Sequence, residues 1–311
     1  MISKVTKAKR RTRLLGATAM VVGAVLGLSA CAAQPAPAGD ADTLTVGIPG
    51  KLSSLYVGNE AGVLNYYVAA LSQEGLVSVD SAGNLVPALA TAWEQPDAKT
   101  YVYEIRPDAK FQNGEPVTMD DVLFSIDQAS DAEVSPQFSW WYENVESVEQ
   151  TGEWQVTFTL KTPDVGFLWV PSASAGLIIA PRTYWEQNEG GLGTAQSLIV
   201  GSGPFAVTEF DPDSHITLEA VDTWWGGESN FDTVRFEVIT DDNTRMLALE
   251  KHNIDLALNV PLQQAERWAQ IDGVTVDSVP NRSYEGLTFD TSVAPFDDVH
   301  VRKAISHSLD R

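Results

Sequence analysis

Short segments of this chain alternate strictly between hydrophobic and polar residues. In residues 154–161 every second residue is hydrophobic, and the same period of two recurs at 216–219 and 234–238. Residues 44–48 form a further short apolar run, which a Pro-Gly pair closes. Alternation places one face of a strand in a core and the other in water. Strands with one wet face are typical of mixed or antiparallel sheets, so we expect such sheets here.

Helical spacing follows clear start signals at two places. Thr118 stands three positions before Asp121, a capping arrangement that leads into hydrophobic residues at helical spacing. Near the end of the sequence, Asp297 or Asp298 can cap a second helix. The apolar positions of that helix are Val301, Ile305 and Leu309. The sequence ends within this element, so we expect the fold to be incomplete at Arg311.

The N-terminal segment has the layout of a secretory signal. Residues 1–13 hold six of the twenty basic residues and no acidic ones, and a run of apolar and small residues follows at 14–30. We predict a signal peptide over residues 1–30. Residues 31–42, rich in Pro and Ala, then form a flexible tether.

Cys31, the only cysteine, follows Leu28-Ser29-Ala30. This stretch resembles the lipobox of bacterial lipoproteins, in which the thiol is alkylated with diacylglycerol before the signal is cut off. An intermolecular disulfide, a buried thiol and the end of an uncleaved membrane anchor are the alternatives. The lipid anchor is favoured, because the tether offers no packed surroundings and the apolar run is short for a membrane span.

Removal of the signal makes the remaining chain strongly acidic. Because six of the twenty basic residues lie in residues 1–30, 14 basic residues then face 42 acidic ones, a formal net charge of −28 over 281 residues. Nucleic acids and anionic lipid headgroups require a basic face, so neither is an expected partner. The hydrophobic content of 44% supports a real core, and the length suggests about two domains.

Reactive patterns that would indicate an enzyme are missing from the sequence. The four histidines and one cysteine form no spaced metal-binding motif. Residues 211–215 carry oxygen ligands at alternate positions but lack the Gly and distal Glu of a calcium loop, so they predict a turn. Ser202 is not a nucleophile elbow, since Val200 occupies the first Gly position. We predict no catalytic residue, cofactor or metal.

Nine tryptophans include two adjacent pairs. Trp140 and Trp141 precede a tyrosine, and Trp224 stands beside Trp225. Clustered aromatic residues can line a ligand cleft. Core packing is the favoured interpretation for both pairs, because neighbouring residues cannot all face one pocket.

Ordered blocks from residue 71 to residue 311 resemble the family 5 solute-binding proteins, the extracytoplasmic receptors of peptide, oligopeptide and nickel ABC importers. The blocks include Leu-Ser-Gln-Glu-Gly-Leu-Val at 71–77, Lys-Phe-Gln-Asn-Gly-Glu-Pro-Val-Thr at 110–118, Gly-Ser-Gly-Pro-Phe at 201–205, Trp-Trp-Gly-Gly at 224–227 and Pro-Phe-Asp-Asp-Val at 295–299. Gly201 and Gly203 allow a tight backbone approach between two subdomains.

The resemblance implies a mixed α/β (α+β) fold of the periplasmic-binding-protein type, class II, in which two lobes enclose the ligand. It divides this chain into a core subdomain of lobe I at 43–73 and 195–281, an inserted subdomain at 74–194, and the start of lobe II at 282–311. Mainly the first lobe is therefore present. We expect the sequence as it stands to bind solute poorly.

The resemblance also implies a function. The expected protein is a monomeric substrate-binding lipoprotein on the extracytoplasmic face of the membrane, with a peptide or similar small solute and ABC permease subunits as partners. The loop after the first strand supplies the predicted ligand contacts, Tyr56, Asn59 and Glu60. The usual Leu-Asp-Pro of that loop is replaced here by residues 55–57, and a solvated loop is the alternative.

Two other functions stay open at this point. A receptor of the same family can serve peptide signalling or chaperoning instead of import. A secreted lipoprotein hydrolase is the enzyme alternative, against which the missing catalytic constellation argues.

Overall fold

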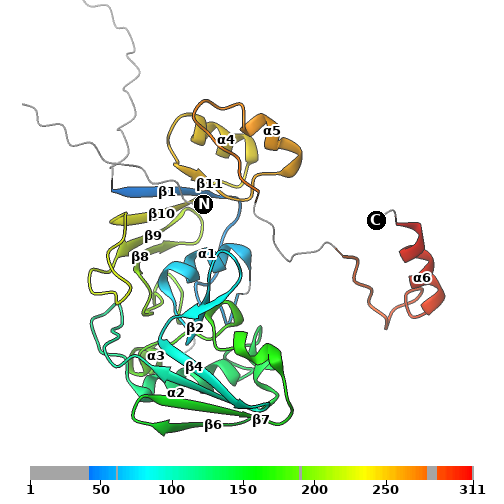
Figure 1. The fold of residues 1–311 in the computed structure, drawn as a ribbon. Helices are drawn as coiled ribbons and strands as arrows, with labels where there is room; N and C mark the ends of the chain where they lie inside the picture. The colour runs from blue at the N-terminus through cyan, green and yellow to red at the C-terminus, as the bar shows by residue number, and fades with distance from the viewer. Residues whose placement is uncertain (1–41, 61, 189–190, 279–285, 310–311) are drawn as a thin grey trace, which may run out of the picture. The chain divides into compact units, whose positions relative to one another are not determined.

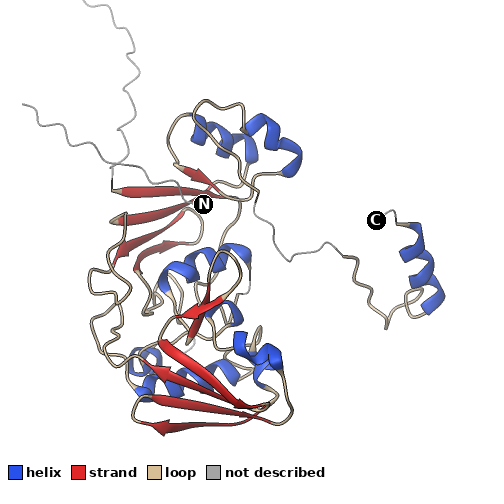
Figure 2. Cartoon of the chain, in the orientation of Figure 1, coloured by secondary structure: helices blue, strands red, loops and turns tan. Residues whose placement is uncertain are grey.

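The computed structural model describes residues 42–60, 62–188, 191–278 and 286–309 (Figure 1). The predicted signal peptide, almost all of the tether and Cys31 lie outside the described residues. Strands and helices are mixed along the chain, which confirms the α/β expectation (Figure 2). Within the described ranges, no helix is long and apolar enough to cross a membrane.

The larger sheet has five strands in the order β11-β1-β10-β9-β8. The strands are β1 (Thr43–Ile48), β8 (Phe205–Asp211), β9 (His215–Ala220), β10 (Thr233–Val238) and β11 (Leu256–Ala257). β1 pairs in parallel with β10 and β11, whereas β10, β9 and β8 pair antiparallel. The sheet is therefore mixed, and the alternating segments at 216–219 and 234–238 form strands as predicted.

A second, antiparallel sheet has the order β4-β5-β7-β6. Its strands are β4 (Ala90–Asp97), β5 (Thr100–Ile105), β6 (Val145–Gly152) and β7 (Gln155–Leu160), and a separate hairpin joins β2 (Val77–Val79) to β3 (Leu85–Pro87). In β7 the hydrophobic residues Val156, Phe158 and Leu160 are buried, which confirms the prediction from alternation.

Six α-helices and four 3-10 turns are described. The helices are α1 (Val63–Ser72), α2 (Met119–Ser130), α3 (Arg182–Gln187), α4 (Asp242–Glu250), α5 (Ala265–Trp268) and α6 (Val299–Ser308). The 3-10 turns are η1 (Ser139–Tyr142), η2 (Val165–Trp169), η3 (Ala173–Ala175) and η4 (Leu262–Gln264). Thr118 and Asp121 form the predicted capping box at the start of α2, and Asp298 caps α6.

Among the residues that the structure describes, buried hydrophobic side chains form three clusters. The insert cluster lies within residues 76–179 and packs α2 on the antiparallel sheet. The sheet cluster joins α1 to the larger sheet, and a smaller one contains Trp268. Phe138 and Trp185 belong to the sheet cluster although they come from the predicted inserted subdomain. The predicted subdomain boundaries stay a prediction.

The insert cluster and the sheet cluster meet where two backbone segments touch. A Cβ on Gly201 would lie 2.2 Å from the carbonyl oxygen of Ser72, and one on Gly203 would lie 2.8 Å from that of Leu71. Only glycine fits at this distance, as the sequence predicts. Gln112 holds the junction: its Nε2 donates to the carbonyls of Ser72 (2.7 Å), Gly203 (3.3 Å) and Phe205 (2.7 Å), and its Oε1 accepts from the Gly201 N–H (2.9 Å).

We predict that Gln112→Leu lowers the free energy of unfolding by about 3 kcal/mol, because backbone groups that lose their partner remain partly buried. Urea unfolding measures the loss. Gln263→Leu, at an exposed position of η4, is the matched control and should change the stability by less than about 0.5 kcal/mol. Equal stability of the two variants would show that the Gln112 amide does not hold the junction.

Candidate ligand-facing site

The carboxyl ends of three parallel strands meet at one edge of the larger sheet. After these ends, the Ile239 N–H donates to the Ile48 carbonyl (2.9 Å) and the Leu258 N–H donates to the Gly47 carbonyl (3.0 Å). Ligands of open α/β sheets bind outside the carboxyl ends of the strands. This edge, with the loop of residues 49–60 that follows β1, is therefore the candidate site.

Arg245 of α4 fixes this edge from inside. Its side chain is fully buried and donates to the carbonyls of Ile239 (2.8 Å) and Asn259 (3.4 Å) and to the Asp242 carboxylate (2.7 Å). A Cβ on Gly47 would lie 3.2 Å from Arg245 Cγ, so the strand passes close to the arginine. This role could not be predicted from the sequence, since no charge pattern marks an arginine as buried.

Glu60 closes the loop of residues 49–60 on itself. Its Oε2 accepts from the N–H and hydroxyl of Ser53 (both 2.7 Å) and from the Ser54 N–H (2.8 Å). The buried amide of Asn65 adds bonds from Nδ2 to the carbonyls of Ser54 and Glu60. This carboxylate oxygen therefore accepts hydrogen bonds from the loop itself. A ligand contact by Glu60 stays a prediction.

Tyr56 lies in the sheet cluster, where only 3% of its surface is exposed. Its ring meets that of Trp185 edge-on with centroids 5.1 Å apart, and burial raises the pKa of its hydroxyl. A Cβ on Gly193 would lie 2.5 Å from the Tyr56 nitrogen, so a second loop packs on its backbone. Core packing leaves the Tyr56 side chain almost no exposed surface, and a ligand contact by Tyr56 stays a prediction.

Asn59 is exposed, and only its backbone is engaged, by an N–H bond to the Tyr56 carbonyl (3.0 Å). Asn59 thus has an exposed side chain, Glu60 is half-buried, and a ligand contact by Asn59 stays a prediction.

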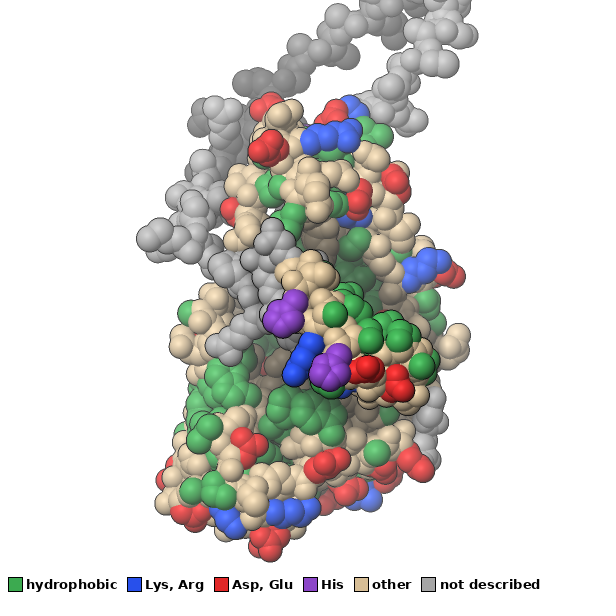
Figure 3. Space-filling model, turned by 90° about the vertical axis from the view of Figure 1, so that its right-hand side faces the viewer, with side chains coloured by type: hydrophobic (Ala, Val, Ile, Leu, Met, Phe, Trp, Pro, Cys, Tyr) green, Lys and Arg blue, Asp and Glu red, His purple; other side chains and the backbone are tan. Residues whose placement is uncertain are grey.

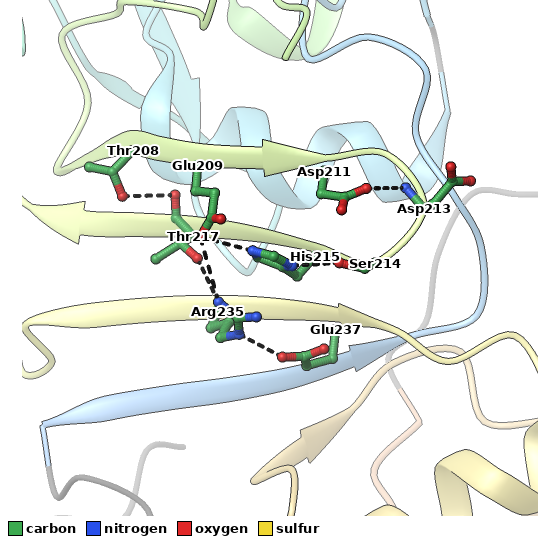
Figure 4. Close-up of polar contacts among 9 residues, drawn as sticks. All are labelled: Thr208, Glu209, Asp211, Asp213, Ser214, His215, Thr217, Arg235 and Glu237. Carbon is green, nitrogen blue, oxygen red and sulfur yellow. Dashed lines mark hydrogen bonds and ion pairs between the residues drawn. The ribbon is translucent and has the colours of Figure 1, made fainter.

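An ionic network covers the wet face of β8, β9 and β10 beside the loop (Figure 4). The Glu209 Oε2 lies 2.8 Å from His215 Nε2, and the histidine is the main cause of the lowered pKa of Glu209. At the turn between β8 and β9, Asp213 pairs with Lys51 of the loop at 2.6 Å. Residues 211–215 form the predicted turn, and the Lys51 charge is neutralised at the surface.

Trp140 and Trp141 form an exposed aromatic step. Their rings stack with centroids 4.1 Å apart and an interplanar angle of 25°, and the side chains are 54% and 37% exposed. The core-packing prediction is wrong for both residues, because the 3-10 turn η1 directs only Tyr142 inward. Hydrophobic side chains are also visible between acidic ones on the face shown in Figure 3.

The aromatic step is joined to the loop of residues 49–60. Trp140 Nε1 donates to the Gln137 carbonyl (3.0 Å), and the Gln137 N–H donates to the carbonyl of Gly58 (3.4 Å), the neighbour of Asn59. The rings of Tyr66 and Phe138 also pack across this contact, with centroids 6.5 Å apart. The exposed rings of Trp140 and Trp141 and the exposed Asn59 amide thus come from two segments that a backbone hydrogen bond joins.

Comparison with known proteins finds relatives of this chain. The oligopeptide-binding protein AppA of Bacillus subtilis is 27% identical over 97% of this chain and 58% of its own length. The dipeptide-binding protein of Escherichia coli is 24% identical over 73% of this chain and 46% of its own length. The chain therefore spans about half the length of these relatives.

Solved structures share the fold. MoaA in complex with mannopinic acid, from Agrobacterium tumefaciens R10, matches with a TM-score of 0.74 and 25% identity over 87% of this chain and 56% of its own. DppA from Helicobacter pylori in complex with the peptide STSA matches with a TM-score of 0.72 and 25% identity over 86% of this chain and 56% of its own.

Residues 84–311, nearly three quarters of the sequence, match the profile of the bacterial extracellular solute-binding proteins, family 5 (Middle). Relatives, structural neighbours and this profile agree with the motifs in the sequence. The chain belongs to the family 5 bacterial extracellular solute-binding proteins.

Proposed function

We propose that this protein is the substrate-binding component of an ABC importer and captures peptides or similar small solutes outside the membrane. The observation that carries the proposal is family membership, together with the names of relatives that bind oligopeptides, dipeptides or glutathione. The relatives are binding proteins, and we infer that this chain also binds its solute without chemical conversion.

The geometry of the candidate site supports a peptide-like solute. An exposed stacked tryptophan pair offers a flat apolar surface with little conformational entropy to lose, and the nearby Asn59 amide can both donate and accept hydrogen bonds. Peptide groups need this combination of apolar contact and paired hydrogen bonds. Micromolar capture requires about −8.2 kcal/mol, which a few such contacts can supply.

In this proposal the first lobe acts as the rigid half of the site. Arg245 fixes the strand ends and Glu60 fixes the loop, so a solute meets groups that are already in place. A second lobe then closes over the solute by a hinge motion, which is biased by contacts that only the closed form makes. The closed form is presented to the permease subunits, and the receptor works as a monomer.

We predict that Trp140→Ala weakens peptide binding about tenfold, or about 1.4 kcal/mol, because the apolar step loses its more exposed ring. Isothermal calorimetry of the protein expressed from its complete gene, without residues 1–30, against di- to nonapeptides measures the change. Trp169→Ala on η2, also an exposed tryptophan, is the control and should bind like the parent protein. A parent protein that binds no peptide, or hydrolyses one, would contradict the proposed function.

We further propose that Cys31 carries a diacylglycerol anchor that tethers the receptor to the extracytoplasmic face of the membrane. The proposal is supported by the Leu-Ser-Ala-Cys sequence at 28–31 after a basic and apolar leader. Two acyl chains, at about 0.8 kcal/mol per buried methylene, hold a protein on a bilayer where one chain is marginal.

Cys31→Ser should abolish incorporation of labelled palmitate in growing cells and leave the protein out of the membrane fraction. Ser29→Ala, two residues earlier, retains the cysteine and a small residue and should stay labelled. Labelled protein in the Cys31→Ser variant would place the lipid on another residue and reject this anchor.

A further inference from the structure

A cavity of about 390 Å³ lies beside the junction of the insert cluster and the sheet cluster. It is bordered by the end of α1, the β2–β3 hairpin, η3 and the adjacent Trp224 and Trp225. Glu74, the second residue after α1, lines this cavity and is mostly withdrawn from water. No part of the candidate ligand-facing site uses this carboxyl group.

Glu74 connects three segments that are distant in the sequence. Its Oε2 accepts a hydrogen bond from the Ser202 hydroxyl (2.9 Å), 128 positions later, and one from Trp225 Nε1 (3.2 Å), 151 positions later. Ser202 stands between the two glycines that touch the backbone of α1. The Glu74 carboxyl therefore sits at the point where the two clusters are held together.

The charges around Glu74 compensate it incompletely. The Arg106 guanidinium lies 3.5 Å from the centroid of the Trp225 ring, and its charge is shared with Asp108. No ion pair joins Glu74 to a cation within the described residues. Tyr66, which lines the same cavity, stays neutral because burial raises its pKa.

Burial raises the pKa of Glu74 from 4.5 to about 7. Hydrogen bonds from Trp225 and Ser202 and the Arg106 charge act in the opposite direction. The desolvation of the carboxylate outweighs them, as expected for a buried acid without an ion-pair partner.

We propose that Glu74 is a proton-sensitive contact between the two clusters, which are held together more strongly when its carboxyl group is protonated than when it is ionised. The protonated Glu74 carboxyl group is neutral, so it lies beside the cavity without an uncompensated charge. In the ionised form the same place holds a poorly solvated carboxylate. The junction therefore weakens as the medium changes from mildly acidic to slightly alkaline.

The direction of the effect follows from proton linkage. Below pH 4.5 Glu74 is protonated in both the folded and the unfolded chain. Between pH 4.5 and about 7 the unfolded chain loses the proton while the folded chain retains it, so the folding constant falls by up to about tenfold per pH unit from this group. Above that range both states are ionised, and the loss is complete.

The test combines two measurements on the chain from residue 31 onward with Cys31→Ser. Carbon-13 NMR of glutamate side-chain carboxyls, assigned with Glu74→Gln, should give one group that titrates close to pH 7. Urea unfolding between pH 5 and pH 8 should show that Glu74→Gln removes a fall in the folding constant that the parent protein displays. The two proteins differ only at residue 74, so the difference between their pH dependences isolates Glu74.

Glu149→Gln, at an exposed position of β6, is the matched control and should keep the pH dependence of the parent protein. Trp225→Phe removes a donor to the carboxylate and should move the Glu74 titration to still higher pH. If every glutamate carboxyl of the parent protein titrates below pH 5, the proposal is overturned, and this outcome needs no assignment and holds even if Glu74→Gln fails to fold. An unchanged pH dependence in a folded Glu74→Gln protein would overturn it as well.

Discussion

The rest of the structure depends on a close approach of two backbone segments. The glycines at 201 and 203 bring the return of the chain within van der Waals distance of the end of α1, where any Cβ would overlap a carbonyl group. Gln112 satisfies the carbonyl and N–H groups that this approach removes from water. The contact lies where the two hydrophobic clusters meet, and residues 177–180 connect the same clusters, because they contribute side chains alternately to one and to the other.

Local features of this fold could be read from the sequence. The capping box at Thr118 and Asp121 involves neighbours on the chain, and the burial of Val156 and Phe158 follows from a period of two. The glycine pair at 201 and 203 was also predicted, because the family motif marks it as a place of close packing. Each of these signals needs only short segments to be interpreted.

The candidate site was harder to predict, because its side chains are oriented by distant contacts. Tyr56 is buried against Trp185, which lies 129 positions later in the sequence. Trp140 is exposed, because in the 3-10 turn η1 only Tyr142 points into the core. Arg245 and Glu74 are ionisable residues of types that usually lie on the surface, and only the folded chain shows that Arg245 is buried and that Glu74 is partly buried. Composition and spacing carry no information about such long-range burial.

The closed loop of residues 49–60 has a consequence for selectivity. Its two charged residues are both already occupied, Lys51 by Asp213 and Glu60 by the hydroxyl and N–H groups of Ser53 and the N–H of Ser54. The Lys51 charge is therefore paired within the chain, whereas the Glu60 carboxylate keeps its charge and uses one oxygen for the loop's own donors. In the proposed receptor, a loop whose only basic residue is already paired would not hold the anionic end of a solute, so recognition of such an end would rest with groups outside the loop.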